Sequence, residues 1–250
     1  MTRIFKDGIA AVFPGLVRYY RSSRNGSILF GVLWSILRRK YRTEGMSFSV
    51  PRYAYPMSCR ASFYFDTYEL GERELTKRLL SKGDQVLELG GGMGVMACLI
   101  DSLIDGGKHV VLEANPSVLG YLEKNRLKNG ASFFPMLGAY SDEPFVQFDA
   151  TDHFAAGRLS SLGKIRVPGF TACEILQKFG SFNVLIADIE GAEIELIAEV
   201  AIPTTPFSKI VLEFHPHITG KEVIDVAVEK LRSVGFKQVE QLGNVVSFQK

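Results

Sequence analysis

The chain has 250 residues, of which 46% are hydrophobic and 22% are charged, and its formal net charge is +2. This composition excludes general disorder, and the small net charge excludes a protein that binds polyanions over its whole surface. The length allows one large domain, or one domain with an appendage. The three cysteines have neither zinc-ligand nor redox spacing, so we expect free thiols in a reducing, cytoplasmic compartment.

Residues 1–63 are predicted to form a basic helical segment ahead of a larger domain over residues 64–250. An apolar run, ILFGVLWSIL, occupies residues 28–37 and is followed by RRK. The run is too short to span a bilayer, which takes about 20 apolar residues, and no signal-peptide cleavage site follows it. Two interpretations stay open: helices packed on the main domain, or a segment with basic anchors that contacts a membrane surface or a partner.

Strand and helix patterns alternate regularly after residue 66. Strands are expected at 85–89, 109–113, 132–137, 183–188 and 209–213, and helices at 67–80 and 221–234 among others. The last segments, KQVEQL and VVSFQ, flank a Gly243-Asn244 turn and are expected to form a hairpin. The pattern predicts an α/β fold, in which a mostly parallel, seven-stranded sheet with a C-terminal antiparallel hairpin carries helices on both faces. It resembles the Rossmann-like ground plan of class I methyltransferases.

Four of the predicted strands end in an acid. These acids are Glu88, Glu113, Asp188 and Glu213. Ligands of doubly wound sheets bind beyond the carboxyl ends of the strands, so the sequence predicts four carboxylates at the same depth on one rim. Such a rim would repel phosphate, and it suits a ligand with cationic and hydroxyl groups. S-adenosylmethionine has a sulfonium, an ammonium and a ribose diol, and we therefore expect it as the cofactor.

A glycine-rich loop follows the first of these strands. Its glycines are Gly90, Gly91, Gly92 and Gly94. Because they have no Cβ, the backbone can approach the methionine portion of the cofactor closely. Glu113, about 20 residues further on, is expected to bind the ribose hydroxyls, and Glu88 to order the loop or meet the ammonium. Further cofactor candidates are Ala114 and Asn115 after the second strand, Gly138 and Ala139 near the adenine edge, and Tyr68 and Glu69 at the preceding helix.

A nicotinamide cofactor is the alternative ligand for this loop. Its usual pattern, G-x-G-x-x-G/A, is broken by Val95 when counted from Gly90, but it is met by Ala97 when counted from Gly92. Glu88 stands where a pyrophosphate would approach, and this favours the methyl donor. An oxidoreductase stays open as a further reading.

A second acidic cluster, IADIEGAEIEL, occupies residues 186–196. The candidates for the base that takes a proton from an alcohol acceptor are His215, Asp188 and Glu190. A divalent cation near Asp188 and Glu213 is conceivable, but no close ligand spacing supports it, so no metal is assigned. Residues 143–170 could fold over the cleft and shape acceptor specificity. The phenylalanines at 145, 148, 154 and 170 would then floor the acceptor site, or else pack a small hairpin.

These motifs resemble the FkbM-type family of S-adenosylmethionine-dependent methyltransferases over roughly residues 64–249. The matching pieces are Tyr68-Glu69, ELGGGMG at 88–94, EANP at 113–116, DIEGAE at 188–193, and Glu213 with His215. Two positions depart from the family pattern. Glu88 stands where an Asp is usual, and Ile186 stands where a Lys is frequent.

The resemblance implies transfer of a methyl group to a hydroxyl oxygen of a sugar, glycan or secondary metabolite. Acceptors vary within the family, so the resemblance does not identify the acceptor. We expect a small-molecule or glycan acceptor and no nucleic acid partner. We expect a cytoplasmic protein, which could contact a membrane surface peripherally. The alternative is a non-catalytic S-adenosylmethionine-binding protein whose N-terminus docks on a membrane or a protein.

Overall fold

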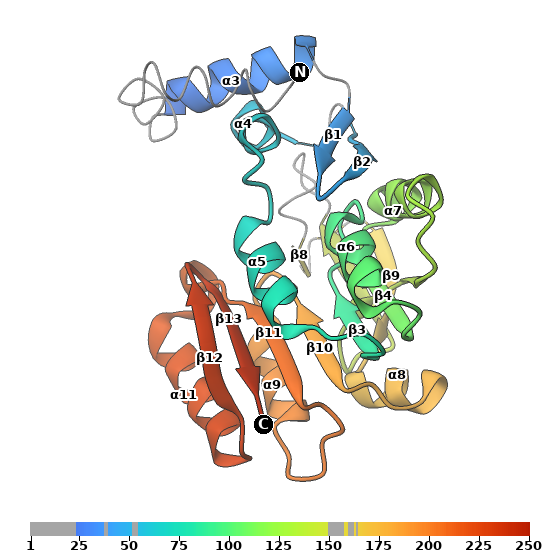
Figure 1. The fold of residues 1–250 in the computed structure, drawn as a ribbon. Helices are drawn as coiled ribbons and strands as arrows, with labels where there is room; N and C mark the ends of the chain where they lie inside the picture. Colours follow the sequence, from blue (N-terminus) through green and yellow to red (C-terminus); the bar gives the residue numbers. More distant parts are fainter. Residues whose placement is uncertain (1–23, 38–39, 52–54, 150–157, 160–162, 164) are drawn as a thin grey trace. The chain divides into compact units, whose positions relative to one another are not determined.

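The computed structural model describes residues 24–37, 40–51, 55–149, 158–159, 163 and 165–250 (Figure 1). The chain forms two compact units, residues 1–70 and residues 71–250. The boundary between them lies after residue 70, whereas the sequence patterns place it after residue 63.

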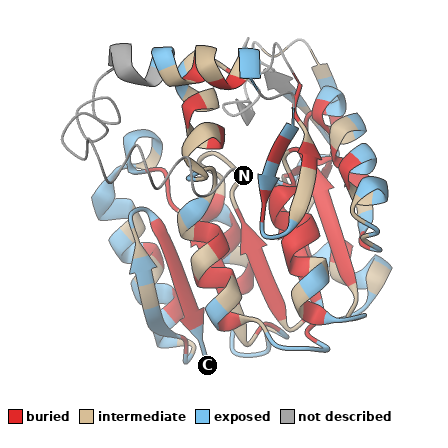
Figure 2. Cartoon of the chain, turned by 45° about the horizontal axis from the view of Figure 1, so that its top comes forward, coloured by how far each residue is buried: buried red, intermediate tan, exposed pale blue. Residues whose placement is uncertain are grey.

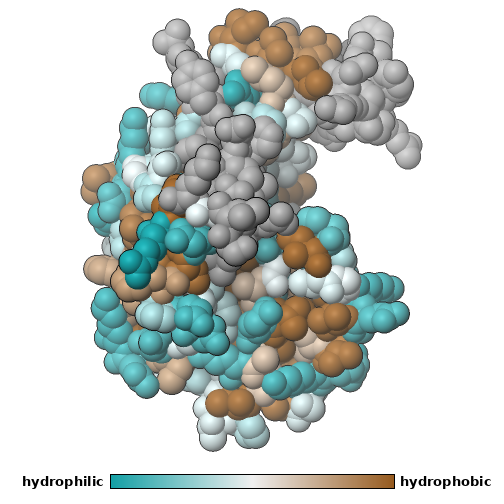
Figure 3. Space-filling model, turned by 180° about the vertical axis from the view of Figure 1, so that it is seen from behind, coloured by the Kyte–Doolittle hydropathy of each residue, from teal (hydrophilic) through white to brown (hydrophobic). Residues whose placement is uncertain are grey.

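The N-terminal unit contains helix α3 (Arg24–Leu37), strands β1 (Lys40–Thr43) and β2 (Met46–Ser49), and helix α4 (Met57–Phe65). The apolar run is helical as predicted, and Trp34 of α3 packs on Phe63 of α4 with ring centroids 5.1 Å apart. Some apolar side chains of α3 are exposed, and Figure 3 shows an apolar surface over this helix. They are Ile28, Leu29, Ile36 and Leu37. Within the described ranges, no helix combines the length and the apolar character that crossing a membrane requires.

A seven-stranded sheet forms the centre of the C-terminal unit. Its strands are β3 (Val86–Leu89), β4 (His109–Glu113), β5 (Phe134–Leu137), β10 (Val184–Ala187), β11 (Lys209–Glu213), β12 (Lys237–Leu242) and β13 (Val245–Gln249). Their order across the sheet is β12-β13-β11-β10-β3-β4-β5. Neighbouring strands pair in parallel, except that β13 is antiparallel to both β11 and β12. The predicted parallel sheet with a closing antiparallel hairpin is confirmed.

Helices cover both faces of this sheet, and the strands between them are largely buried (Figures 1 and 2). The helices are α5 (Leu70–Leu79), α6 (Val95–Ile104), α7 (Pro116–Lys128), α8 (Ala172–Phe179), α9 (Glu193–Val200), α10 (Pro216–Thr219) and α11 (Lys221–Ser233). Leu196 of α9 and Leu231 of α11 share one core with Leu87 and Leu185 of the strands. Since side chains alternate along a strand, Glu88 points to the opposite face, where α5, α6 and α7 lie.

A smaller sheet lies between β5 and α8 in the sequence. Its strands are β6 (Ala139–Tyr140), β7 (Phe145–Asp149), β8 (Arg158–Leu159) and β9 (Ile165–Phe170), in the order β6-β9-β7-β8. Strands β7 and β9 pair antiparallel, from Phe145 with Pro168 to Phe148 with Ile165. Helix α8 begins with a capping box, in which Thr171 and Glu174 exchange hydrogen bonds between side chain and backbone.

The glycine loop between β3 and α6 lies directly against a neighbouring strand end. Gly90 has a φ of +93°, and an ideal Cβ on it would lie 2.0 Å from the carbonyl oxygen of Asp188. A Cβ on Gly91 would lie 2.3 Å from Cγ1 of Val111 and 2.6 Å from Cδ1 of Leu122. Glycine is therefore required here first by the packing of the protein on itself.

We expect Gly90→Ala to lower the free energy of unfolding by about 3 kcal/mol or more, because the new Cβ would combine backbone strain with a clash against Asp188. Gly83→Ala is the matched control. Gly83 also has a positive φ, +79°, but no atom lies within 4 Å of its ideal Cβ, so strain alone should cost about 1 kcal/mol. Urea unfolding followed by circular dichroism measures both, and equal losses would show that the Asp188 contact does not limit this position.

Candidate functional site

Three acids stand at one level of the sheet. The strand registers align Glu113, Asp188 and Glu213 at the carboxyl ends of parallel strands, and side-chain alternation turns all three to the face with α5, α6 and α7. Glu88 is level with Ile186 instead, two residues or about 6.6 Å deeper in the sheet. The prediction that four carboxylates share one depth is therefore wrong for Glu88, because the parallel register pairs Glu88 with Ile186 and Val111 and places Gly90 level with the three acids.

Glu88 pairs with a buried histidine. Its Oε2 lies 2.8 Å from Nε2 of His109, and the two side chains are 2% and 0% exposed. Burial raises the pKa of Glu88 to about 8 and lowers the pKa of His109 to about 3. At neutral pH both side chains are therefore uncharged, and either Oε2 of Glu88 or Nε2 of His109 supplies the proton of the hydrogen bond between them. Glu88 thus links β3 to β4 through its contact with His109, at a level below the loop. Its contact with a cofactor stays a prediction.

Glu113 joins the glycine loop to the start of α7. Its carboxylate accepts hydrogen bonds from the backbone N–H groups of Gly92 and Asn115, each at 2.7 Å. Burial raises the pKa of Glu113 to about 7, although these N–H groups oppose the rise. Each carboxylate oxygen has a second acceptor position, so Glu113 can also accept hydrogen bonds from hydroxyl groups of a ligand.

Asn115 has a side-chain donor that the described residues leave without a partner. Its oxygen accepts a hydrogen bond from the N–H of Ser117 at 3.0 Å and caps α7, as the Asn-Pro sequence predicts. Its nitrogen Nδ2 is buried and has no hydrogen-bond partner in the described part of the chain. Buried polar groups are nearly always hydrogen-bonded, so Nδ2 indicates an acceptor that comes from outside these residues.

The other predicted cofactor residues of this edge lie close to Glu113. The N–H of Gly138 donates to the carbonyl oxygen of Glu113 at 3.0 Å. A Cβ on Gly138 would lie 2.7 Å from the ring of Phe170, so the small residue is needed for packing. Ala139 is buried, and Ala114 packs against its cluster. These residues lie together at the carboxyl ends of β4 and β5, and their contact with a cofactor stays a prediction.

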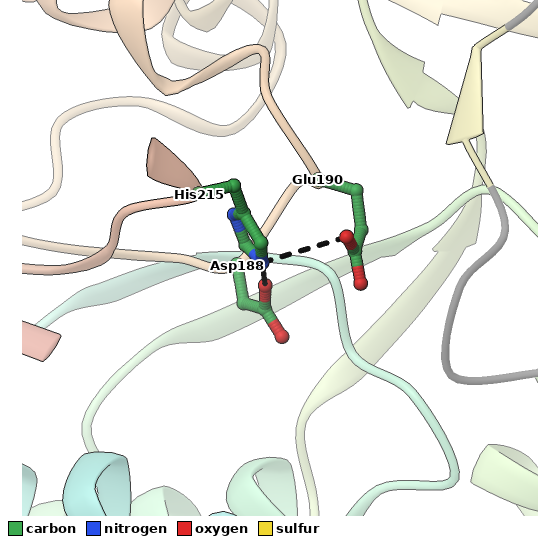
Figure 4. Close-up of side chains that lie close together, drawn as sticks. All are labelled: Asp188, Glu190 and His215. Carbon is green, nitrogen blue, oxygen red and sulfur yellow. Dashed lines mark ion pairs between the residues drawn. The ribbon is translucent and has the colours of Figure 1, made fainter. Parts of the chain in front are cut away.

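The loops after β10 and β11 bring Asp188, Glu190 and His215 together (Figure 4). Nε2 of His215 lies 3.5 Å from Oδ1 of Asp188 and 3.4 Å from Oε2 of Glu190. On the other side of the ring, Nδ1 lies 3.0 Å from Oε1 of Glu193. The three candidates for the catalytic base therefore form one cluster, and the buried carboxylate of Glu193 supports it from behind.

The charges in this cluster influence one another strongly. Burial alone would lower the pKa of His215, but the hydrogen bond with Glu193 and the negative charges of Asp188 and Glu190 outweigh burial and raise this pKa to about 9. Burial raises the pKa of Glu190 and of Glu213. With no metal bound, the imidazole is thus protonated at neutral pH, and the proton acceptors of the cluster are its carboxylates.

Two sets of side chains among the described residues have a spacing that a metal ion could use. Asp188, Glu190 and His215 form one set, and Glu72 of α5, Asp188 and Glu213 form the other. Within each set the potential ligand atoms all lie within 4.8 Å of one another. Asp188 belongs to both sets and also adjoins the glycine loop, so it lies at the centre of the rim.

Tyr68 and Glu69 belong to the N-terminal unit, just before α5. The hydroxyl of Tyr68 lies 3.2 Å from the hydroxyl of Tyr55, and its ring packs on Phe63 with centroids 4.8 Å apart. Tyr68 therefore packs against aromatic side chains of the N-terminal unit. The proposed cofactor contacts of Tyr68 and Glu69 stay predictions.

The predicted aromatic floor of the acceptor site is described only in part. Phe170 packs on Gly138, and the half-exposed ring of Phe145 lies 4.0 Å from the guanidinium of Arg166. The side chains at 148 and 154 lie outside the described residues. An acceptor role for this floor stays a prediction.

Three residues of the site give little signal in the sequence. Glu193 stands at a helix N-terminus, where solvated acids are common, yet here it is fully buried and accepts the N–H of Gly191 at 3.0 Å. Glu72 lies in a helix that shows only an amphipathic pattern. The pairing of His109 could have been found from the alternation of side chains along the strands. A polar residue in a buried strand needs a polar neighbour, and Glu88 lies in the preceding predicted strand.

We expect the free energy of unfolding to fall with pH between about 6.5 and 8, and Glu88 to account for about 1.4 kcal/mol per pH unit of this fall. Glu88 ionises near pH 4.5 in the unfolded chain but near pH 8 in the folded protein, so its contribution is complete below pH 4.5 and is lost as the pH rises to 8. His109 has the opposite sign, since its pKa falls from 6.5 to about 3 on folding, and it offsets Glu88 below pH 6.5.

Urea unfolding at several pH values across this window measures the slope. Glu88→Gln should make the decline shallower by about 1.4 kcal/mol per pH unit, because glutamine does not titrate. Glu113 and His215, whose pKa values are raised to about 7 and about 9, continue to contribute to the decline. Glu123→Gln, at an exposed position of α7, should retain the full slope. An unchanged slope in Glu88→Gln would show that the carboxyl group of Glu88 is already ionised in the folded protein.

No protein-family model matches the chain, and no curated protein matches it. Solved structures do resemble it. The Pyrococcus horikoshii protein PH0793 is 11% identical with a TM-score of 0.50, covering 84% of this chain and 70% of that chain. Aeropyrum pernix fibrillarin with natively bound S-adenosyl-L-methionine is 17% identical with a TM-score of 0.44, covering 71% and 72%. M. jannaschii TYW2 in complex with AdoMet is 12% identical with a TM-score of 0.45, covering 84% and 85%. At such identities the likeness concerns the fold alone, and the fold of this chain is the Rossmann-like fold of class I methyltransferases.

Proposed function

We propose that this protein is an S-adenosylmethionine-dependent methyltransferase that methylates a hydroxyl oxygen of a sugar, glycan or secondary metabolite. The proposal rests on the carboxylates of Glu113, Asp188 and Glu213, which lie at one level of the sheet beside the glycine loop. Carboxylates at one level disfavour a phosphate group and favour a cationic ligand. S-adenosylmethionine combines cationic groups with hydroxyls, and the fold is one that class I methyltransferases use.

The rim residues fit this cofactor chemically. Asn115 presents a buried N–H donor without a partner among the described residues, and the adenine and ribose offer acceptors. Glu113 has acceptor positions for the ribose hydroxyls beyond the two N–H groups that it already binds. The loop from Gly90 to Gly94 would hold the methionine portion.

The bound cofactor would supply a methyl group on a sulfonium sulfur, which the acceptor oxygen attacks in line. The work of the protein is then to orient the acceptor, to exclude water and to receive the acceptor proton. The backbone of Asp188 touches Gly90 of the loop, so the carboxylates of Asp188 and Glu190 would receive the proton. His215 would hold both carboxylates in place.

The assignment to the FkbM-type family is the finer part of the proposal and rests on sequence motifs. EANP begins at the last residue of β4 and DIEGAE begins directly after β10, so both motifs lie at the same edge of the sheet. The hydroxyl acceptor follows from this resemblance. Incubation with S-adenosylmethionine and a panel of glycans and hydroxylated metabolites, analysed by mass spectrometry, would reveal an acceptor that gains one methylene.

The exposed apolar side chains of α3 favour a second candidate, a cofactor-binding protein that docks through its N-terminal unit. Ile36 and Leu37 are 71% and 68% exposed, and basic residues follow them in the sequence. Such a protein would bind S-adenosylmethionine but would methylate no acceptor of the panel. Ile36→Ser with Leu37→Ser would then weaken its association with anionic vesicles and leave cofactor affinity unchanged.

We expect Glu113→Ala to weaken S-adenosylmethionine binding by about tenfold, which corresponds to about 1.4 kcal/mol, because the ribose loses its acceptor. Glu123→Ala removes an exposed acid of α7 and should leave the affinity unchanged. Isothermal titration with S-adenosylmethionine and with its demethylated product measures both variants. If the unmodified protein binds neither compound, the proposal fails.

We expect Asn115→Ser to weaken the same binding by roughly fivefold, since about 1 kcal/mol is typical of one hydrogen bond. Serine caps a helix about as well as asparagine does, so the helix should keep its stability while the Nδ2 donor is lost. The titration is accompanied by thermal unfolding of the variant. An unchanged affinity in a folded variant would show that Nδ2 does not face the cofactor.

A further inference from the structure

His215 is held differently on the two sides of its ring. Nδ1 lies 3.0 Å from Glu193, within the range of about 2.7–3.2 Å that is usual for a hydrogen bond. Nε2 lies 3.4 Å from Glu190 and 3.5 Å from Asp188, outside that range. The side chain of His215 is buried, with 9% of its surface exposed, and Nε2 points toward the carboxylates of Asp188 and Glu190 (Figure 4).

The longer separations match ligands of one metal ion. When metal–ligand bonds are about 2.0–2.2 Å long, two ligands of a tetrahedral ion lie about 3.3–3.6 Å apart. Both distances from Nε2 fall within this interval. The three potential ligand atoms also lie within 4.8 Å of one another, so one ion could reach them all with small side-chain movements.

Glu193 provides the support that a metal-binding histidine requires. Metal-bound histidines nearly always donate their second ring N–H to a carboxylate or a carbonyl group, which fixes the tautomer and turns the other nitrogen to the metal. Glu193 is 0% exposed, and its own position is fixed by the N–H groups of Ile189 and Gly191. A buried, fixed carboxylate on Nδ1 leaves Nε2 as the nitrogen that can carry a metal.

The loop that carries Glu190 has an unusual backbone. Glu190 has a φ of +51° and is followed by Gly191 with a φ of +109°. A residue other than glycine rarely adopts such a φ, because this backbone conformation is strained. The turn places Glu190 beside His215, so the strain is consistent with a carboxylate held for a ligand.

We propose that Asp188, Glu190 and His215 bind one divalent transition-metal ion through one nitrogen and two carboxylate oxygens. A donor set of imidazole and carboxylates suits ions such as Zn²⁺, Co²⁺ or Mn²⁺ better than Ca²⁺ or Mg²⁺, which prefer oxygen ligands alone. Three protein ligands leave at least one position open. If the proposed methyl transfer is correct, that position would receive the acceptor hydroxyl and lower its pKa.

A Co²⁺ titration tests the site, because the visible absorption of Co²⁺ reports its coordination. The full-length protein, freed of metal with a chelator, should bind one Co²⁺ per chain, and Zn²⁺ should displace it. Glu190→Gln and His215→Ala should each weaken binding at least tenfold. Glu193→Gln keeps the size of the side chain and should weaken binding by roughly tenfold through the orientation of His215.

Two controls define the location. Glu195→Gln changes an exposed acid on the same helix as Glu193 and should bind Co²⁺ like the unmodified protein. Glu213→Gln alters the neighbouring set with Glu72 and should also retain binding. No saturable binding by the folded protein would overturn the proposal, as would loss in Glu213→Gln with binding retained in Glu190→Gln.

The same variants separate this proposal from the proposed function. Glu190→Gln should bind S-adenosylmethionine with unchanged affinity in a titration, since the cofactor is assigned to the glycine loop and Glu113. Co²⁺ binding without S-adenosylmethionine binding would support the metal site and contradict the methyltransferase. The reverse result would support the methyltransferase and overturn the metal site.

Discussion

The close approach of β3 and β10 at Gly90 and Asp188 is the constraint on which the rest of the site depends. A Cβ on Gly90 would lie 2.0 Å from the Asp188 carbonyl oxygen, so only glycine permits this approach. The parallel register then places Glu113, Asp188 and Glu213 at one level. One backbone contact thereby joins the loop that would hold a cofactor to the acids that would handle an acceptor.

Acids of the same kind have different roles here because their depth differs. Glu88 lies below the rim, where burial keeps it protonated and paired with His109. Glu193 is equally buried but accepts backbone N–H groups and supports His215. Glu113 and Asp188 lie at the rim beside the loop. The inner carboxyl groups thus stabilise the structure, and the outer ones lie where the proposed cofactor and acceptor would bind.

The sheet was predictable from the sequence because its signals are local. The apolar runs that end in Glu113 and Glu213 have the bounds of β4 and β11, and the Gly243-Asn244 turn marks the final hairpin. The depth of Glu88 was not predictable in this way, since it depends on the register of β3 with β10 and β4, which places Glu88 two residues below the rim. The partners of His109 and Glu193 depend on register and on long-range packing, which residue spacing in a single sequence does not contain.

The site therefore combines a predicted outline with contacts that only the fold provides. Asn115 illustrates both, since its cap on α7 follows from the Asn-Pro sequence, while the burial of its nitrogen without a partner among the described residues follows from packing. The cluster around His215 illustrates the second part, because its three members come from loops that the sheet brings together.

The most direct measurement is equilibrium binding of radiolabelled S-adenosylmethionine to the full-length protein in the presence of competing cofactors. A rim of carboxylates predicts one saturable site, from which S-adenosylhomocysteine displaces the label and NAD⁺ or NADP⁺ does not. Displacement by a dinucleotide at a similar concentration, or no saturable binding of the label, would contradict this interpretation of the rim.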